Sequence, residues 1–193
     1  MSRIAPLQPP YAAEIQEQFD KVMPPGAPPL VLFRTIATSL RAWGKLRGGS
    51  MLDRGPLSLH EREIVIDRTT ALNACEYEWG VHVAIFTGPA KLSEAQVRAT
   101  VLEKADAACW SAAEQALIAA VDALHHRSTW SEQEFAALQK HYDNDRILEI
   151  IQLSGAYRTI SCCGRAWRRL HRHCERSFVG WAKARCAVPT FLL

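Results

Sequence analysis

The sequence predicts an all-α fold, and two patterns carry that prediction. Apolar residues recur at intervals of three and four over most of the chain up to about residue 160, which is the period of one helix face. In four places a serine stands three residues before a glutamate or glutamine, immediately ahead of such a run. The pairs are Ser58/Glu61, Ser93/Gln96, Ser111/Glu114 and Ser131/Glu134. Each pair has the form of a capping box, in which two side chains satisfy backbone donors at a helix start. No segment reads as a strand.

The expected helices follow one another with short connections, which favours antiparallel packing. After a proline-punctuated arm over residues 1–10, we expect helices over residues 11–22, 30–45, 59–72, 75–86, 93–104, 111–126, 131–142 and 146–160. Pro24-Pro25-Gly26 ends the first of these, and glycines and Pro56 bound a loop ahead of the third.

Length and composition indicate one globular domain. The chain has 193 residues, of which 48% are hydrophobic and 22% charged, so wholesale disorder is excluded. It shows neither an N-terminal apolar signal nor a run of about 18 apolar residues, so we expect no membrane partner and a cytoplasmic location. The six cysteines are then expected as reduced thiols rather than a disulfide scaffold.

The net charge of +3 is unevenly distributed. Residues 161–193 hold seven Lys/Arg against one Glu, which leaves −3 for the first 160 residues. We therefore divide the chain into a helical domain, residues 1–160, and a basic Cys/Arg/His-rich tail, residues 161–193. A slightly acidic body is not typical of a nucleic-acid-binding domain, and the tail lacks regular metal-ligand spacing, so neither nucleic acid nor a metal is expected. Three interpretations of the tail stay open: a basic helix, a poorly ordered segment, or a shifted reading frame.

The candidate chemistry lies in residues 61–86. Cys75, Glu78 and His82 are spaced i, i+3 and i+7, which places them on one helix face. Glu63, twelve residues before Cys75, comes within reach if the two helices pack together. A thiol, a carboxylate and an imidazole can support nucleophilic or acid–base chemistry. The alternative is structural, with Glu78–His82 a surface pair and Cys75 a small buried apolar residue.

Asn73-Ala74 is a candidate break between the two helices. If the chain breaks there, Cys75 lies in the first turn of the next helix, where the helix dipole favours a thiolate. If the helix continues, His82 is the main activator of the thiol. Tyr77 and Trp79 are expected to pack in the core rather than stack on a substrate.

This segment resembles the carboxymuconolactone decarboxylase family, which includes the alkylhydroperoxidase D-like proteins. The peroxidase branch carries a Glu followed twelve residues later by Cys-x-x-Cys-x-x-x-His. Glu63, Cys75 and His82 match the Glu, the first Cys and the His, while Glu78 stands at the second Cys. Residues 62–66 and 76–79, followed by His82, are similar to a decarboxylase-like branch. The resemblance is specific over about residues 30–90 and extends to about residue 160. It implies a helical bundle of the alkylhydroperoxidase D-like type that self-associates as a trimer or hexamer.

The resemblance implies a first function, that of a cofactor-free oxidoreductase with peroxidase (peroxiredoxin-type) activity on a small-molecule substrate. The Cys75 thiolate attacks the O–O bond and becomes a sulfenic acid, His82 draws off the thiol proton, and Glu63 holds or resupplies it. Glu78 cannot form a disulfide, so turnover requires another cysteine or an external thiol reductant.

A second function is that of a lyase or isomerase acting on a small carboxylate or lactone. Here Glu63, Glu78 and His82 transfer the proton, and Arg62 or Arg68 holds the anion. Replacement of a redox cysteine by Glu78 favours this chemistry. The third alternative is a non-catalytic oligomeric member of the family, in which the same charged residues form interface ion pairs.

Overall fold

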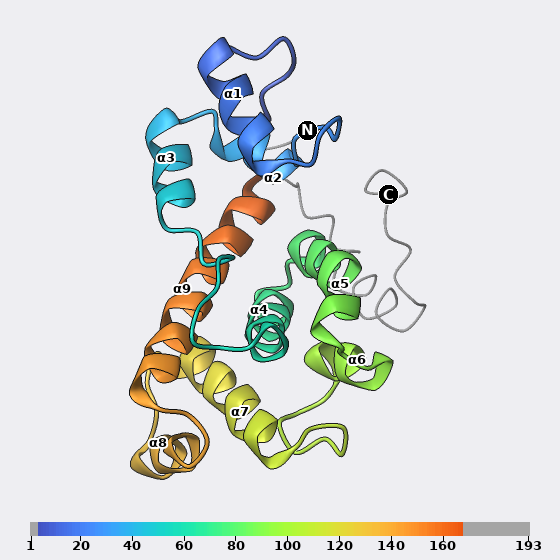
Figure 1. The fold of residues 1–193 in the computed structure, drawn as a ribbon. Helices are drawn as coiled ribbons and strands as arrows, with labels where there is room; N and C mark the ends of the chain where they lie inside the picture. The colour runs from blue at the N-terminus through green and yellow to red at the C-terminus, as the bar shows by residue number, and fades with distance from the viewer. Residues whose placement is uncertain (1–3, 168–193) are drawn as a thin grey trace.

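The computed structural model describes residues 4–167, and within that range it contains α-helices and no strand (Figure 1). The all-α prediction is confirmed. The helices are α1 (Ala13–Val22), α2 (Val31–Ile36), α3 (Leu40–Gly48), α4 (Leu59–Leu72), α5 (Glu76–Ala90), α6 (Glu94–Leu102), α7 (Ala112–Arg127), α8 (Glu132–Gln139) and α9 (Asn144–Trp167).

Helix α4 occupies the centre of the fold. It packs against α5, α6, α7 and α9, and Figure 1 shows it enclosed between them. Every residue from Arg62 to Thr70 is buried, including two arginines, a glutamate and an aspartate. Charged side chains on a helix covered on all sides need partners inside the protein, because burial removes most of their contact with water. The candidate site results from this constraint.

All four predicted capping boxes form. The serine side chain accepts a hydrogen bond from the backbone N–H three residues on, and the glutamate or glutamine reaches back to the serine N–H. These boxes begin α4, α6, α7 and α8 at the residue after each serine. The local signal therefore determined these starts.

The predicted helix over residues 30–45 is wrong, because the structure has two helices there. Helix α2 ends at Ile36, and Ser39 adopts an extended conformation and accepts a hydrogen bond from Ala42 N–H as the N-cap of α3. Thr38 also bonds back to the Thr35 carbonyl. Serine and threonine compete with the helical hydrogen bonds in this way, so apolar periodicity alone did not reveal the break.

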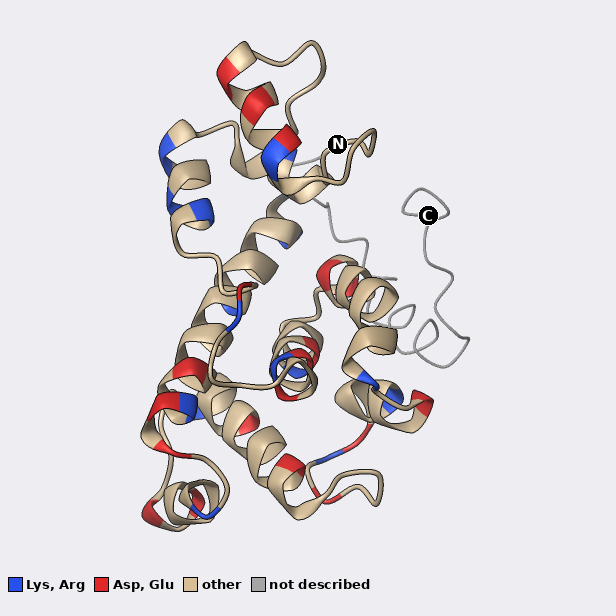
Figure 2. Ribbon diagram, viewed as in Figure 1, with Lys and Arg blue, Asp and Glu red and all other residues tan. Residues whose placement is uncertain are grey.

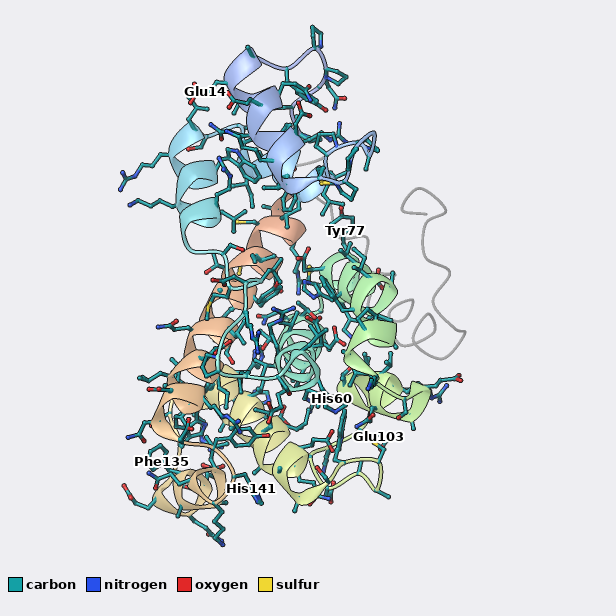
Figure 3. The ribbon with its side chains drawn as sticks, in the orientation of Figure 1. Glu14, His60, Tyr77, Glu103, Phe135 and His141 are labelled. Atoms are coloured by element: carbon teal, nitrogen blue, oxygen red, sulfur yellow. The ribbon has the colours of Figure 1, made fainter. Side chains whose placement is uncertain are left out.

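Helices α1 to α3 have an apolar core of their own. Ile15, Phe19, Leu32, Ile36 and Trp43 are buried together, apart from the main core around α4. Tyr77 of α5 lies toward this N-terminal unit and packs partly against it (Figure 3).

Trp79, two residues after Tyr77, is buried in the main core and donates a hydrogen bond to the Thr100 hydroxyl. Both aromatic residues therefore pack, as predicted.

The predicted break between α4 and α5 is confirmed. Asn73 ends α4 and bonds its side-chain amide back to the Thr69 carbonyl, while Ala74 has a positive φ of 50°. Cys75 is the residue that caps the N-terminus of α5. The chain thus turns sharply enough to lay α5 along α4.

Helix α9 continues through the predicted boundary at residue 160. Residues 161–167 form its last turns, so this part of the basic segment is helical. The rest of the predicted tail lies outside the described residues. No helix between residues 4 and 167 is long and apolar enough to cross a membrane.

Candidate active site

Glu63 and His82 form a buried pair between α4 and α5. The His82 Nδ1 atom lies 2.7 Å from Glu63 Oε2, and the two side chains are 3% and 1% exposed. The close packing of the two helices brings these residues into contact. A carboxylate oxygen accepts the Nδ1 proton, so a neutral His82 carries its lone pair on Nε2.

Glu78 lies on the other side of the same imidazole, one helical turn before it. Its Oε1 is 3.7 Å from His82 Nε2, too long for a hydrogen bond but within ion-pair range. Burial raises the pKa of the Glu78 carboxyl, and His82 opposes that rise. The other oxygen, Oε2, has no hydrogen-bond partner in the described part of the chain. An acid and a base thus lie side by side without being bonded to each other.

Arg62 holds Glu63 from the opposite side. Its Nε donates to Glu63 Oε1 at 3.3 Å, and its Nη1 donates to the carbonyls of Leu52 and Asp53. The guanidinium carbon also lies 5.9 Å from the centre of the Phe86 ring. Because these contacts fix the guanidinium, Arg62 is a positioning group for Glu63 more than a holder of a substrate anion.

Arg68 points away from the cluster, which contradicts its predicted role as an anion holder. It makes two hydrogen bonds to the Asp122 carboxylate of α7, at 2.6 and 2.9 Å. It also donates to the carbonyls of Thr100 and Glu103. Six residues separate Arg62 from Arg68, and on a helix buried all round this sends the two side chains to different neighbours.

Asp67 is a buried acid that the sequence interpretation missed. It lies one turn after Glu63 on α4 and is 1% exposed. Burial, and then the Glu63 carboxylate, raise the pKa of Asp67 well above its usual value. Its Oδ1 has no hydrogen-bond partner among residues 4–167. The spacing of Glu63 and Asp67 was visible in the sequence, but the complete burial of α4 was not.

Cys75 lies against α9. A Cβ on Gly164 of α9 would lie 3.1 Å from its Sγ. Burial raises the pKa of the Cys75 thiol, although the Glu78 backbone N–H, Ser161 and Arg165 each lower it. The pKa of the Cys75 thiol is therefore raised despite its position at the start of α5.

A large cavity opens against Glu78 and His82. Its volume is about 1020 Å³, and it lies between the N-terminal unit, α5 and α9. Apolar side chains form most of its wall, and Tyr157 and Phe86 flank His82 at ring-centre distances of 5.0 and 5.1 Å. Cys75 is not part of this wall. Of the predicted site residues, Glu78 and His82 thus face the space that a substrate can enter.

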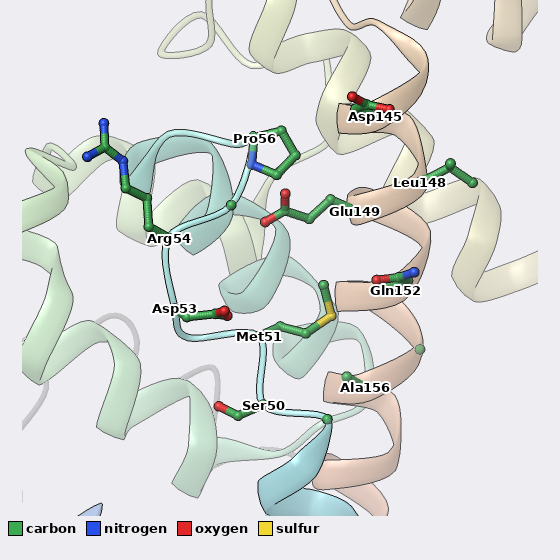
Figure 4. Close-up of a pocket in the computed structure, with 13 residues that line it drawn as sticks. Ser50, Met51, Asp53, Arg54, Pro56, Asp145, Leu148, Glu149, Gln152 and Ala156 are labelled. Atoms are coloured by element: carbon green, nitrogen blue, oxygen red, sulfur yellow. The ribbon is translucent and has the colours of Figure 1, made fainter.

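A second, more open groove lies between the loop of residues 49–56 and α9 (Figure 4). Glu149 of α9 points toward the loop, accepts a hydrogen bond from Leu57 N–H and fills the space beside Gly55, whereas Arg54 points away. The start of this loop, from Gly49 to Leu52, also lines the large cavity. Glu149 therefore anchors a loop that forms part of the cavity wall.

The fold and the cluster define an all-helical protein with buried carboxyl and imidazole groups beside an apolar cavity. Within residues 4–167, no group of three His, Cys, Asp or Glu side chains is arranged to hold a metal ion. The sequence model of the carboxymuconolactone decarboxylase family matches residues 37–122, so this part of the chain is similar to that family. The matched range contains Glu63, Cys75, Glu78 and His82. No curated protein matches the chain.

Proposed function

We propose that the protein is an acid–base catalyst, a lyase or isomerase that moves a proton on a carboxylate or lactone. One observation carries the proposal: Glu78 and His82 lie together in the wall of the apolar cavity, and Cys75 does not. An apolar pocket with a few convergent polar groups is the usual form of a small-molecule site.

The two residues suit different halves of a proton transfer. Glu63 accepts the Nδ1 proton of His82, which leaves Nε2 free to act as the base. Burial raises the pKa of Glu78 toward the range in which a carboxyl group keeps its proton and acts as a general acid. Arg62 holds Glu63, and Tyr157 and Phe86 hold the imidazole ring from its sides.

The proposed decarboxylation is balanced by one proton. The bond between the carboxylate and its carbon breaks, the electron pair moves into an adjacent carbonyl as an enolate, and CO2 leaves. Glu78 then delivers its proton to that carbon as the electron pair returns. In the isomerase form, His82 Nε2 removes a proton beside the carbonyl and Glu78 delivers its own proton at another carbon. The proton on His82 Nε2 then returns to the Glu78 carboxylate, 3.7 Å away, which restores both groups.

The peroxidase alternative has weaker support from the geometry. Its thiol is 3% exposed, is absent from the cavity wall and has a raised pKa, whereas a peroxidatic cysteine needs access and a thiolate. Cys75 has Glu78 three residues on, where the family pattern places a second cysteine. In the peroxidase alternative, an external thiol reductant would complete the cycle.

Deuterium incorporation tests the proposal. Small lactones and carbonyl acids are incubated with the protein in D₂O, and exchange or CO2 release is followed by NMR. We expect Glu78→Gln and His82→Gln to lower the rate about 10²–10⁴-fold, the usual contribution of a general acid or base. The rates of Cys75→Ser and of the exposed control Glu132→Gln should stay within about threefold of the wild-type rate. Loss of activity in Cys75→Ser, together with unchanged activity in Glu78→Gln, would overturn the proposal.

A further inference from the structure

The large cavity is bigger than a small lactone requires. Its volume of about 1020 Å³ lies at the upper end of the roughly 300–1,000 Å³ that is typical of small-molecule sites. A compact substrate placed at Glu78 and His82 would leave most of this space to water. The dimensions therefore favour a ligand with a body that extends away from the acid–base pair.

The wall that such a body would contact is apolar. It combines the proline-rich segment of residues 22–28 with Leu32, Phe33, Val81 and Ile85. Burying the methylene groups or rings of a ligand against this surface favours binding by roughly 0.8 kcal/mol for each CH₂.

Arg47 is the permanent cation that residues 4–167 place in the same wall. Arg47 is half-buried near the end of α3, and its guanidinium carbon lies 5.9 Å from the centre of the Trp43 ring, which also lines the cavity. Among the described residues, no carboxylate lies within ion-pair distance of Arg47. In the cavity wall, Glu78 is the acidic residue, and it lies on α5 beside His82.

Arg47 and Glu78, two ionisable residues of the cavity wall, favour different groups of a ligand. Arg47 can make a two-point contact with a carboxylate, because the guanidinium presents parallel N–H donors. An anionic group of the ligand placed beside Glu78 would not be stabilised there, because a carboxyl group offers it no positive charge. The wall thus orders a ligand with its anion at α3 and its uncharged portion at α5. Figure 2 shows the lysines and arginines that line α3.

We propose that the cavity binds an elongated, largely apolar carboxylate, whose anionic end is held by Arg47 and whose apolar body extends toward Glu78 and His82. This inference rests on the proposed function only for the end of the ligand that reacts. Because the carboxylate held by Arg47 does not react, the inference applies to the isomerase form, with a carbonyl or lactone group of the ligand at Glu78 and His82. The carboxylate at Arg47 is then an anchoring group, and Arg47 sets specificity without taking part in the proton transfer.

Isothermal titration calorimetry with octanoate, 1-octanol and butyrate tests this binding directly. We expect octanoate to bind about tenfold more tightly than octanol, because only the carboxylate pairs with Arg47. Butyrate lacks four methylenes and should bind about 100-fold more weakly than octanoate. Increasing salt should weaken the binding of octanoate but not that of octanol.

Two arginine variants on α3 locate the anion. Arg47→Gln should weaken octanoate about tenfold and leave octanol unchanged, while Arg47→Lys should retain part of the preference. Arg41→Gln is the matched control, since Arg41 is exposed on the same helix and does not line the cavity. Circular dichroism confirms that each variant is folded. A cavity-narrowing change on the loop, Ala27→Trp, should weaken both octanoate and octanol.

The outcomes separate this inference from the proposed function. Octanoate binding that survives Glu78→Gln, with no turnover of any substrate, would support the anchoring site and count against the acid–base function. Equal affinities for octanoate and octanol, equal weakening of both by Arg47→Gln, or no binding of any alkyl ligand would overturn the inference, whatever the activity.

Discussion

Replacement of Glu63 by alanine tests the buried cluster at its most connected residue. The carboxylate accepts hydrogen bonds from His82 at 2.7 Å and from Arg62 at 3.3 Å, and it is almost wholly removed from solvent. Removing Glu63 leaves the Arg62 guanidinium without its carboxylate partner, and breaking a buried charged pair in this way costs about 3–5 kcal/mol. The lost Cγ methylene adds about 1 kcal/mol. We therefore expect Glu63→Ala to lower the free energy of unfolding by about 4–6 kcal/mol.

Glu63→Gln removes the charge of the side chain and keeps its shape. The carbonyl oxygen of glutamine can still accept one of the two hydrogen bonds from His82 and Arg62, but its NH₂ group then faces the other donor. We expect Glu63→Gln to lower the free energy of unfolding by about 1–3 kcal/mol, which is the cost of an unsatisfied buried polar group. The difference between the alanine and glutamine variants therefore measures how much the cluster depends on keeping an acceptor.

Urea unfolding followed by circular dichroism provides the measurement, at one fixed protein concentration so that self-association does not bias the comparison. Glu132→Ala, on the exposed face of α8, should change the unfolding free energy by less than about 0.5 kcal/mol. A loss below about 1 kcal/mol for Glu63→Ala would refute the reasoning, since it would mean that the pair is solvated.

Two further predictions concern groups with raised pKa values. Because the folded pKa of Asp67 is raised, its contribution to stability is complete below about pH 4 and is lost as the pH rises through the folded value. Asp67→Asn should therefore flatten the decline in unfolding free energy above pH 4, and a pH profile parallel to that of the wild type would contradict this. Buried Cys75 should react with iodoacetamide far more slowly than exposed Cys162, which peptide mass spectrometry can measure. Preferential labelling of Cys75 in the native protein would contradict its assignment as a buried thiol.

Local sequence signals were sufficient for most helices. Each capping box joins a serine to the residue three positions later, so the interaction that starts the helix can be recognised from the local sequence. The serines are Ser58, Ser93, Ser111 and Ser131. The break at Asn73-Ala74 was found for the same reason. The break at Ser39 was missed because the apolar period continued across it, while the competing hydrogen bonds came from Thr38 and Ser39.

The candidate site was predictable only in part. Helical spacing together with the family resemblance singled out Glu63, Glu78 and His82, and the structure brings these three together. The same spacing put Cys75 on their face, but Cys75 caps the helix and turns toward α9. Spacing describes positions within a regular helix and does not apply at its first residue, where the backbone leaves helical geometry.

The sequence by itself determined where α4, α6, α7 and α8 begin, that the protein is all-helical, and which acid and base share one face of α5. Only the tertiary structure decided that α4 is enclosed on every side. That enclosure makes Asp67 a buried acid, directs Arg62 to Glu63 and Arg68 to Asp122, and leaves an apolar cavity between two separate cores. The physical reason is range: hydrogen bonds at helix ends join near neighbours, whereas burial depends on segments that are distant in the chain.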